Sequence, residues 1–560
     1  MTITSLSGAE ALLRVLKEMG VERIYASPGS DWAPLWEALA RPEAEREFPH
    51  YISSRHEETA VAMAMGYAKA TGRLAAVALH TTVGALHAAM LLRACLHERI
   101  PLVVLAGESI AFSEAGFVPV GRQWLRLLTD LGGPARLMEA CAKWSFGLNA
   151  GPLLPHTIQR ACQIAMAAPK GPVFVSVPIE HLVATVPVPS PPASLPLAPE
   201  ASEAAIDRLA EALNDAANPV IITEESGRDP AAVAALVGVA ETLGAPVFEA
   251  WQPYYVNFPR AHPLAGGVAY DDMPDLLADA DAVFLVECVL PWHPPSRIVD
   301  KKVLVLGEEP LHGRLPFWGF RTDIIATGEA TASLRALLRK LKQRSPHHDW
   351  PARLDRRRAT HVQAARSAGA KPLIETAWVG HELNRVLPMD AVVVNETITH
   401  RLGLHEQLVR LAPGGFYEAS YGGLGGGLGL ALGIKSAWPE RTVILTIGDG
   451  AFHYNPVVAG FGAAQEHGLP IFVLLFNNAG YLSQKTDVLR SFPQGEAAKV
   501  GKVVGTAITP APDYPALVRA YGGVGERVEK PAALGAALER GLASVAQGRL
   551  ALLEVVLQPV

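Results

Sequence analysis

Short apolar segments that alternate with longer helical patterns restrict the fold of this chain more than any other feature. Val173–Val177, Ala282–Val286 and Val443–Ile447 are examples, and each is almost continuous in apolar residues. A strand with little polar character on either face is buried on both sides, as in a parallel sheet covered by helices. The alternation therefore predicts an α/β protein whose parallel sheets are flanked by helices.

The length of 560 residues is several times that of a usual single domain. Two changes in composition divide the chain. Residues 185–201 contain six prolines and predict an extended connection, whereas residues 340–371 are polar and basic and predict a solvated helical linker. We therefore expect three domains, at residues 1–184, 202–342 and 370–560. The second begins like a Rossmann fold but lacks a Gly-x-Gly-x-x-Gly fingerprint, so we predict no essential FAD or NAD there.

Charge and hydropathy exclude several classes of protein. The net charge is −6 and no long basic face is visible, so nucleic acid is not an expected partner. The apolar runs are shorter than the roughly 18 to 20 residues of a membrane helix, and the first residues lack the pattern of a secretory signal. The four cysteines have no paired spacing. These features predict a cytoplasmic globular protein that makes no contact with membranes.

The most informative motif lies near the carboxyl end. Gly448-Asp449-Gly450 follows one apolar segment, and Asn477-Asn478 follows the next. The loops after parallel strands line the ligand crevice of a sheet, where a carboxylate and an amide can share one hard cation such as Mg²⁺. Flanking glycines also allow a phosphate to approach the backbone. Taken singly, each motif is more typical of an ordinary tight turn.

At this separation the two motifs resemble the diphosphate and Mg²⁺ motif of thiamine-diphosphate-dependent enzymes. The resemblance implies that Asp449, Asn478 and the carbonyl of Gly480 are metal ligands. It also implies a pyrimidine-binding first domain and a diphosphate-binding third domain. The implied cofactor-binding positions are Glu57, Asn395, Thr397, Thr399, Gly422, Leu424, Gly448, Asp449, Gly450, Ala451, Asn478, Gly480 and Tyr481.

The stretch Arg55-His56-Glu57-Glu58, followed by Gly66-Tyr67-Ala68, resembles the segment in which this family places its activating glutamate. On that resemblance Glu57 hydrogen-bonds the aminopyrimidine ring, and Glu58 is the competing candidate. The glycine-rich run from Gly422 to Gly429 has two interpretations: close packing of a helix, or the family's loop, in which Leu424 bends the cofactor and the Gly422 carbonyl accepts its amino hydrogen.

Substrate-binding candidates follow two early strands. Ser30 comes after a Pro-Gly turn, and His80 lies in a polar loop after Leu79. Both positions resemble benzoylformate decarboxylases, as does His262 before a proline, although a His-Pro pair at this place is equally compatible with a packing role. The resemblance implies that Ser30 recognises a carboxylate and that His80 and His262 transfer protons, so Glu57, His80, His262 and Ser30 are the predicted catalytic set. Gln484 is a further substrate candidate and, as a neutral amide, no acid.

The sequence departs from two other groups of the family. Ala111–Phe117 lacks the histidine pair of pyruvate decarboxylases, and Gly121–Trp124 is all that resembles the acetolactate synthase segments. The favoured function is the non-oxidative decarboxylation of a 2-oxo acid, with aldehyde carboligation as a side activity. An acetolactate-synthase-like carboligase or a 2-hydroxyacyl lyase is the first alternative. A catalytically silent homologue that only binds the cofactor is the second.

The resemblance also implies an assembly. In this family the glutamate of one subunit faces the diphosphate motif of another, so a homodimer is required and a homotetramer is expected. The predicted ligands are thiamine diphosphate, Mg²⁺, and a small 2-oxo acid and aldehyde.

Overall fold

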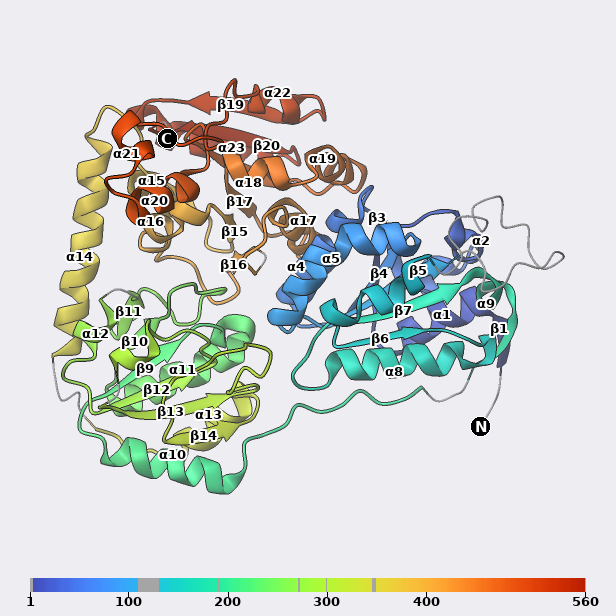
Figure 1. Ribbon diagram of the computed structural model, residues 1–560, viewed down its shortest axis with the longest axis horizontal. Helices are drawn as coiled ribbons and strands as arrows, with labels where there is room; N and C mark the ends of the chain where they lie inside the picture. The colour runs from blue at the N-terminus through green and yellow to red at the C-terminus, as the bar shows by residue number, and fades with distance from the viewer. Residues whose placement is uncertain are drawn as a thin grey trace. The chain divides into compact units, whose positions relative to one another are not determined.

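The computed structural model describes residues 4–108, 130–188, 192–269, 272–298, 300–344, 349–419 and 421–558 (Figure 1). The chain forms two compact units that do not follow its order. Unit 1 consists of residues 1–197, 420–439 and 454–469, and unit 2 of residues 198–419, 440–453 and 470–560. Two helices from the C-terminal part of the sequence, α17 (Gly427–Ala437) and α19 (Val457–Glu466), therefore belong with the N-terminal domain.

Unit 1 is built on a six-stranded parallel sheet with the strand order β3-β2-β4-β5-β7-β6. Its strands are β2 (Arg23–Ser27), β3 (His50–Ser53), β4 (Ala75–Leu79), β5 (Leu102–Glu108), β6 (Trp144–Gly147) and β7 (Val173–Pro178). The larger helices are α1 (Gly8–Glu18), α2 (Ala33–Leu39), α4 (Glu57–Thr71), α5 (Thr81–His97) and α8 (Leu154–Met166). All five residues of β4 are buried, as expected for a central strand covered on both faces. A short antiparallel pair, β1 (Thr4–Ser7) and β8 (Thr185–Val188), completes the unit.

Helices α4 and α17 pack closely because glycines leave room at their contact. A β-carbon at Gly66 would lie 2.2 Å from the Leu430 carbonyl oxygen, and one at Gly433 would lie 2.0 Å from the Met63 carbonyl oxygen. No side chain fits at these distances. Part of the glycine-rich run therefore serves helix-to-helix packing, and its first residues form the loop described below.

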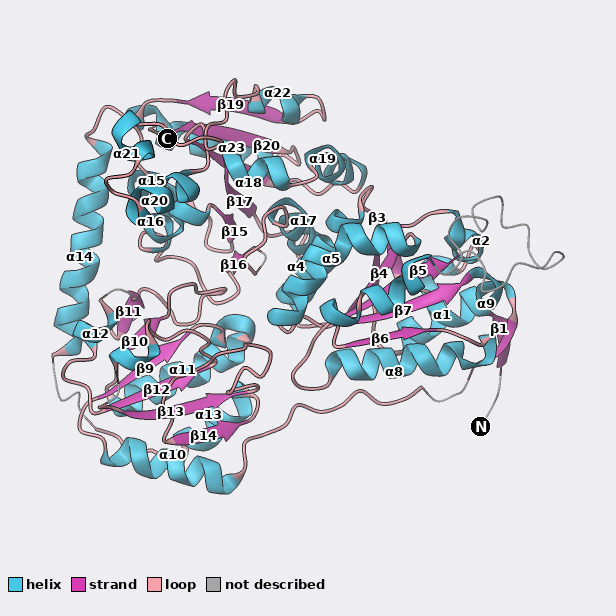
Figure 2. Ribbon diagram, in the orientation of Figure 1, coloured by secondary structure: helices cyan, strands magenta, loops and turns pink. Residues whose placement is uncertain are grey.

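Unit 2 contains the other two sheets (Figure 2). The central sheet has the order β11-β10-β9-β12-β13-β14 and comprises β9 (Pro219–Thr223), β10 (Val247–Glu249), β11 (Ala265–Val268), β12 (Ala282–Val286), β13 (Lys302–Gly307) and β14 (Ile324–Thr327). Its main helices are α10 (Glu203–Asp215), α11 (Pro230–Leu243) and α13 (Ala330–Leu338). Phe248, Phe284 and Leu334 are fully buried in its core.

The C-terminal sheet has the order β16-β15-β17-β18-β20-β19. Its strands are β15 (Val392–Glu396), β16 (Phe416–Glu418), β17 (Val443–Gly448), β18 (Phe472–Asn477), β19 (Val524–Val528) and β20 (Ala551–Val556). The associated helices include α15 (Thr376–Val386), α16 (Arg401–His405), α18 (Asp449–Tyr454), α20 (Leu482–Ser491), α22 (Tyr514–Arg519) and α23 (Pro531–Ala546). When the strands of each sheet are numbered along the chain, this sheet and the six-stranded sheet of unit 1 both have the order 2-1-3-4-6-5. The two sheets therefore share one topology.

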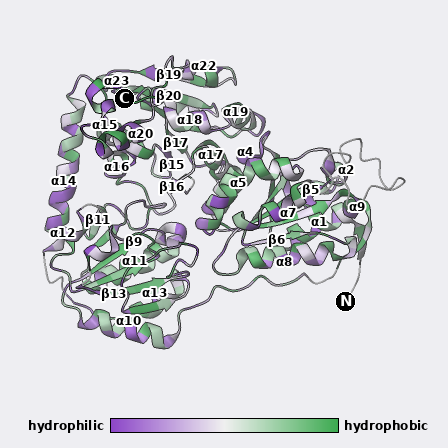
Figure 3. Cartoon of the chain, viewed as in Figure 1, coloured by the Kyte–Doolittle hydropathy of each residue, from purple (hydrophilic) through white to green (hydrophobic). Residues whose placement is uncertain are grey.

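The basic segment predicted as a helical linker is α14 (Trp350–Gly369), which is largely hydrophilic in Figure 3. It is nevertheless anchored. Trp350 is 1% exposed, and the Arg358 guanidinium donates to the carbonyl oxygens of His262 and Ala265 at 3.3 and 3.0 Å. The basic residues thus tie the helix to the central domain as well as face solvent.

The predicted fold class is confirmed: three six-stranded parallel sheets carry the chain, and helices flank them. Each six-stranded sheet lies within one of the three predicted domain ranges, whereas β8 lies beyond the end of the first range. The compact units divide the chain differently, so the domain bounds stay a prediction. Within the ranges the structure describes, no helix is both long enough and apolar enough to cross a bilayer.

Candidate functional site

The predicted metal ligands lie at the carboxyl ends of two adjacent strands of unit 2. Strand β17 pairs in parallel with β18, and Gly448 lies opposite Phe476. Asp449 and Asn478 therefore follow the two strands at the same edge of the sheet. The Gly480 N–H donates to Asp449 Oδ2 at 3.0 Å and to Asn478 Oδ1 at 3.3 Å, so the two side-chain oxygens converge on one group.

Asp449 is 2% exposed, and burial raises its pKa to about 6. The backbone N–H groups of Gly450 and Gly480 oppose this rise by donating to its two oxygens. A buried carboxylate beside an amide oxygen is the donor set that a hard divalent cation prefers. The residues present fit the Mg²⁺ that the resemblance implies.

The loop that carries these oxygens is sterically fixed. A β-carbon at Gly480 would lie 2.3 Å from the Thr506 carbonyl oxygen, and one at Gly450 would lie 2.8 Å from the Tyr481 ring. Ala479 has a φ of +57°, which a non-glycine residue seldom adopts. Backbone atoms therefore require glycine at position 480, whereas a side chain at position 450 would have to displace the Tyr481 ring.

The structure distinguishes the two asparagines of the motif. Asn477 donates to Glu554 Oε1 at 2.6 Å and accepts from the Ala479 N–H at 2.9 Å, so its side chain holds the loop. Asn478 instead donates through Nδ2 to His400 Nε2 at 3.2 Å. Because burial lowers the pKa of His400 to about 4, its ring is neutral near pH 7. His400 thus accepts from the amide nitrogen of Asn478 and directs the amide oxygen away from itself.

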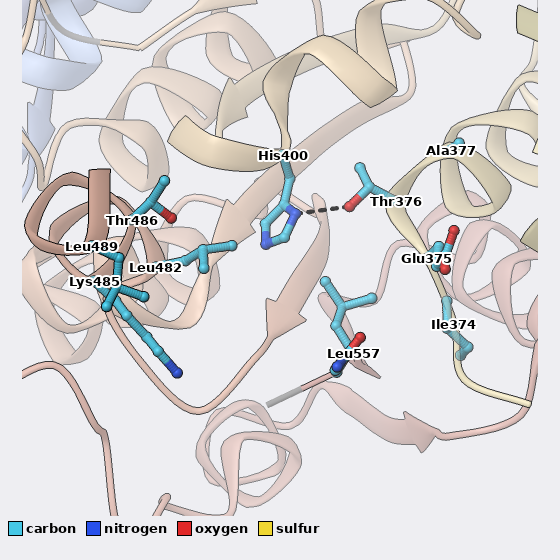
Figure 4. Close-up of a pocket in the computed structure, with 11 residues that line it drawn as sticks. Ile374, Glu375, Thr376, Ala377, His400, Leu482, Lys485, Thr486, Leu489 and Leu557 are labelled. Atoms are coloured by element: carbon cyan, nitrogen blue, oxygen red, sulfur yellow. Dashed lines mark hydrogen bonds between the residues drawn. The ribbon is translucent and has the colours of Figure 1, made fainter. Parts of the chain in front are cut away.

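His400 also lines a cavity of about 530 Å³ (Figure 4). Its Nδ1 lies 2.7 Å from the Thr376 hydroxyl, and its ring stacks on Phe476 at 5.7 Å. Leu482, Thr486 and Lys485 of α20 line the cavity on the side of His400 away from Thr376 (Figure 4). Sequence reasoning missed His400, although it directly follows the predicted Thr399.

Of the residues predicted to bind the phosphates, Asn395 and Thr397 are buried and Thr399 is exposed. The buried Asn395 amide donates to Glu418 at 2.9 Å, and its oxygen accepts from the hydroxyls of Thr397 and Thr446. Thr399 is exposed on the following turn, where the β-branched Ile398 has a φ of +48°. Asn395 and Thr397 therefore hold this loop in place through buried hydrogen bonds. Thr399, in contrast, is exposed to solvent.

The other predicted half-site lies in unit 1, at the start of α4. Glu57 is the first residue of the helix, and the preceding His56 caps it by accepting the Glu58 N–H at 3.2 Å. A β-carbon at Gly84 would lie 3.1 Å from Glu57 Cγ and 3.5 Å from His80 Cβ, so Glu57 and His80 are close neighbours.

Glu58 points elsewhere in the unit. A β-carbon at Gly425 would lie 2.8 Å from its Oε1. In the same loop Gly422 has a φ of +70° and Leu424 is half-buried, consistent with a turn that presents an apolar side chain. The competing glutamate therefore faces this loop, while Glu57 lies beside Gly84 near His80.

His80 belongs to a buried dyad that the sequence did not predict. Its Nδ1–H donates to Asp31 Oδ1 at 2.6 Å, and the side chains are 21% and 1% exposed respectively. The hydrogen bond to Asp31 is the main cause that raises the pKa of His80. A β-carbon at Gly107 would lie 2.0 Å from Asp31 Oδ2, so this glycine makes room for the carboxylate. Because β2 and β4 pair with Ser27 opposite Leu79, the loops bearing Asp31 and His80 are adjacent.

The other substrate candidates are less connected. Ser30 is exposed at the start of a short turn, and Gln484 is exposed on α20, where it accepts from Ser483 at 2.8 Å. His262, in unit 2, lies 3.2 Å from Glu241, accepts from the Leu264 N–H and packs edge-on against Phe258. These contacts give His262 a local packing role. The segments 111–117 and 121–124 lie outside the described residues.

The crevice of the central domain is acidic. Glu224, Glu225 and Glu287 are 4%, 3% and 7% exposed, and they follow the adjacent strands β9 and β12. Glu224 accepts the N–H groups of Val289 and Leu290, and burial raises its pKa to about 7. Carboxylates at the place where a Rossmann fold binds a pyrophosphate oppose such an anion. The absence of an essential FAD or NAD stays a prediction.

Comparison with known proteins identifies related families over both ends of the chain. Residues 6–124 match the family described as "Thiamine pyrophosphate enzyme, N-terminal TPP binding domain", and residues 399–555 match its C-terminal TPP binding domain. The acetolactate synthase isozyme 3 large subunit of Escherichia coli is 26% identical, over 98% of this chain and 94% of the relative. The benzoylformate decarboxylase of Pseudomonas aeruginosa is 27% identical, over 91% and 92%.

Solved structures share the fold. The benzoylformate decarboxylase of Polynucleobacter necessarius superposes with a TM-score of 0.82 at 21% identity, covering 99% of this chain and 100% of the other. A 4-hydroxybenzoylformate decarboxylase of Rhodococcus jostii gives the same TM-score and coverage at 24% identity. At these identities the likeness concerns the architecture.

Proposed function

Because the chain belongs to the thiamine-diphosphate-dependent enzymes, we propose that it decarboxylates a 2-oxo acid without oxidation and joins aldehydes in a side reaction. The observation that carries the choice of decarboxylation is the Asp31–His80 dyad beside Glu57. A histidine held by a buried carboxylate can deliver and take up a proton near neutral pH. Carboligation alone does not need such a residue.

Each residue has a defined part in this proposal. Asp449, Asn478 and the Gly480 carbonyl would hold Mg²⁺, and the strand-to-helix junction at Gly448–Ala451 together with Thr399 would receive the diphosphate. Leu424 would lie against the cofactor, which when bound supplies the nucleophile and the electron sink. Glu57 would hydrogen-bond the pyrimidine ring of the cofactor. His80, oriented through Nδ1 by Asp31, offers Nε2 to the substrate, and Ser30 binds its carboxylate.

The proposed assembly is a homodimer as the smallest active unit and a tetramer as the complete one. Its support is the family resemblance, in which the glutamate and the metal ligands of one site come from different subunits. Light scattering of the purified protein measures the mass directly, and a monomer with full activity would contradict this part of the proposal.

The second candidate is carboligation as the main reaction, which the similarity to acetolactate synthase supports. A panel of aliphatic and aromatic 2-oxo acids, incubated with thiamine diphosphate and Mg²⁺ and assayed for CO₂, aldehyde and ketol together, separates the two. We expect aldehyde as the main product. Ketol as the main product from every donor would favour the second candidate.

Substitutions test the residue assignments. The His80→Ala variant should lose at least about 100-fold in decarboxylation, as expected for a general acid–base group, and should keep its cofactor affinity. The Glu57→Gln variant should lose turnover with every donor. Glu37→Gln on the exposed face of α2 is a matched control for charge removal. Unchanged decarboxylation by His80→Ala would remove the dyad from the mechanism.

A further inference from the structure

The carboxylate of Glu57 has a neighbour that the reaction as proposed does not use. His87, on the second turn of α5, lies with Nδ1 3.3 Å from Glu57 Oε2. Its ring stacks on that of His56, with centroids 5.4 Å apart and planes inclined by 3°. His56 is itself fixed, because its Nδ1 caps α4. The stack therefore restrains a His87 side chain that is 61% exposed.

The two oxygens of Glu57 have different surroundings. Oε2 meets the N–H of His87, whereas Oε1 lies against Gly84, where an added β-carbon would approach to 3.3 Å. Because residue 84 is a glycine, no side chain projects from that position toward Oε1. His87 thus contacts one carboxylate oxygen, and a glycine lies beside the other.

The ligand atoms of His56, Glu57 and His87 also lie within 4.8 Å of one another, a spacing compatible with a metal ion. The geometry disfavours that use. Parallel stacked rings point their nitrogen lone pairs in parallel planes, which do not converge on one ion, and Nδ1 of His56 already serves as the helix cap.

We propose that His87 is a positioning residue, which holds Glu57 Oε2 so that Oε1 is the oxygen that hydrogen-bonds the cofactor. The inference rests on the proposed function, since it assigns a part in the activation of the same cofactor. His87 acts only through Glu57 and carries no proton to the substrate.

Side-chain geometry gives a sharp set of variants. The Nδ1 of histidine and the amide nitrogen of asparagine are the same number of bonds from Cα, whereas the amide nitrogen of glutamine is one bond further. The His87→Asn variant therefore keeps a donor at the required place, His87→Gln displaces it, and His87→Ala removes it. His156→Ala, on the exposed face of α8, is the matched control.

The test has two stages, so that its failure is distinct from a failure of the proposed function. Calorimetry first measures thiamine diphosphate binding by the wild-type protein with Mg²⁺; an absence of binding overturns the proposed function itself. Proton NMR of quenched samples then measures how fast the reactive thiazolium carbon of the bound cofactor exchanges its proton for deuterium. This rate reports Glu57 without any substrate.

We expect His87→Ala and His87→Gln to slow this exchange about tenfold, as the loss of a hydrogen bond to a charged group does. His87→Asn should stay within about twofold of the wild type, and cofactor affinity and thermal midpoint should not change in any variant. Exchange by His87→Ala at the wild-type rate overturns the inference. So does slowing that His87→Asn fails to restore.

Discussion

Replacing Asp31 by asparagine tests the dyad at the centre of the proposed mechanism. The 2.6 Å bond from His80 joins two groups that are 21% and 1% exposed, so solvent screens it little. A hydrogen bond to a charged group contributes about 1.5–3 kcal/mol, and a positive charge on the donor adds Coulombic attraction to the carboxylate. The coupling free energy between the residues should therefore be larger when His80 is an imidazolium ion.

The pH dependence follows from the raised pKa of His80, whose first cause is the bond to Asp31. When the pKa of a basic group is higher in the folded protein than in the unfolded one, the group stabilises the folded state fully at pH values below its unfolded-state pKa. This contribution is lost as the pH rises through its folded-state pKa. We expect a coupling in the upper part of the range of about 1.5–3 kcal/mol near pH 6 and in its lower part near pH 9, because only the imidazolium charge is lost. In NMR titrations His80 should also show a lower pKa in Asp31→Asn than in the wild type.

A double-mutant cycle of Asp31→Asn and His80→Gln, measured by urea unfolding at both pH values, gives this coupling. The more exposed pair His361–Glu406, 3.0 Å apart and 26% and 24% exposed, provides a control cycle that should give a smaller value. A coupling below about 0.5 kcal/mol at both pH values, or a larger one near pH 9, would refute the reasoning.

Three further substitutions address the metal site and the core. Asp449→Asn removes the carboxylate from the predicted ligands and should weaken Mg²⁺-dependent cofactor binding at least about 100-fold; equal affinity in calorimetry would contradict its role. His400→Phe keeps an aromatic ring but removes the acceptor for Asn478, so Mg²⁺ affinity should fall about tenfold, which a Mn²⁺ competition titration measures. Lys69→Met breaks a fully buried ion pair with Glu98, 2.5 Å apart, and should cost about 3–5 kcal/mol in urea unfolding. Replacing both partners by methionine should recover most of that loss, and a double variant as unstable as the single one would count against this account.

The sequence was most informative where a function depends on one loop after one strand. Asp449 and Asn478 each directly follow an apolar segment, and their neighbours in the chain are also their neighbours in space. The choice between Asn477 and Asn478 was available only from the family resemblance. The structure adds a physical reason for choosing Asn478, because the side chain of Asn477 is hydrogen-bonded to Glu554, which is 77 residues away in the sequence.

Residues that act through distant partners were not visible in the sequence. Asp31 and His80 are 49 positions apart, and their contact depends on which strands pair in the sheet. His87 reaches Glu57 only because α5 packs beside α4. A local pattern contains neither the strand order nor the packing of two helices. Asp31 after a Pro-Gly turn and His80 after a strand therefore appear unrelated in the sequence.

The three sheets separate what topology determines from what the residues determine. In each, polar groups follow the two neighbouring strands where the strand order reverses: β2 and β4, β15 and β17, and β9 and β12. Topology thus predicts a crevice at all three places. The first contains an Asp–His dyad and the second a buried carboxylate beside an amide oxygen, whereas the third is filled by buried glutamates with backbone and side-chain partners. A rule based on fold alone would treat the three crevices alike, and the chemistry of the side chains is what distinguishes them.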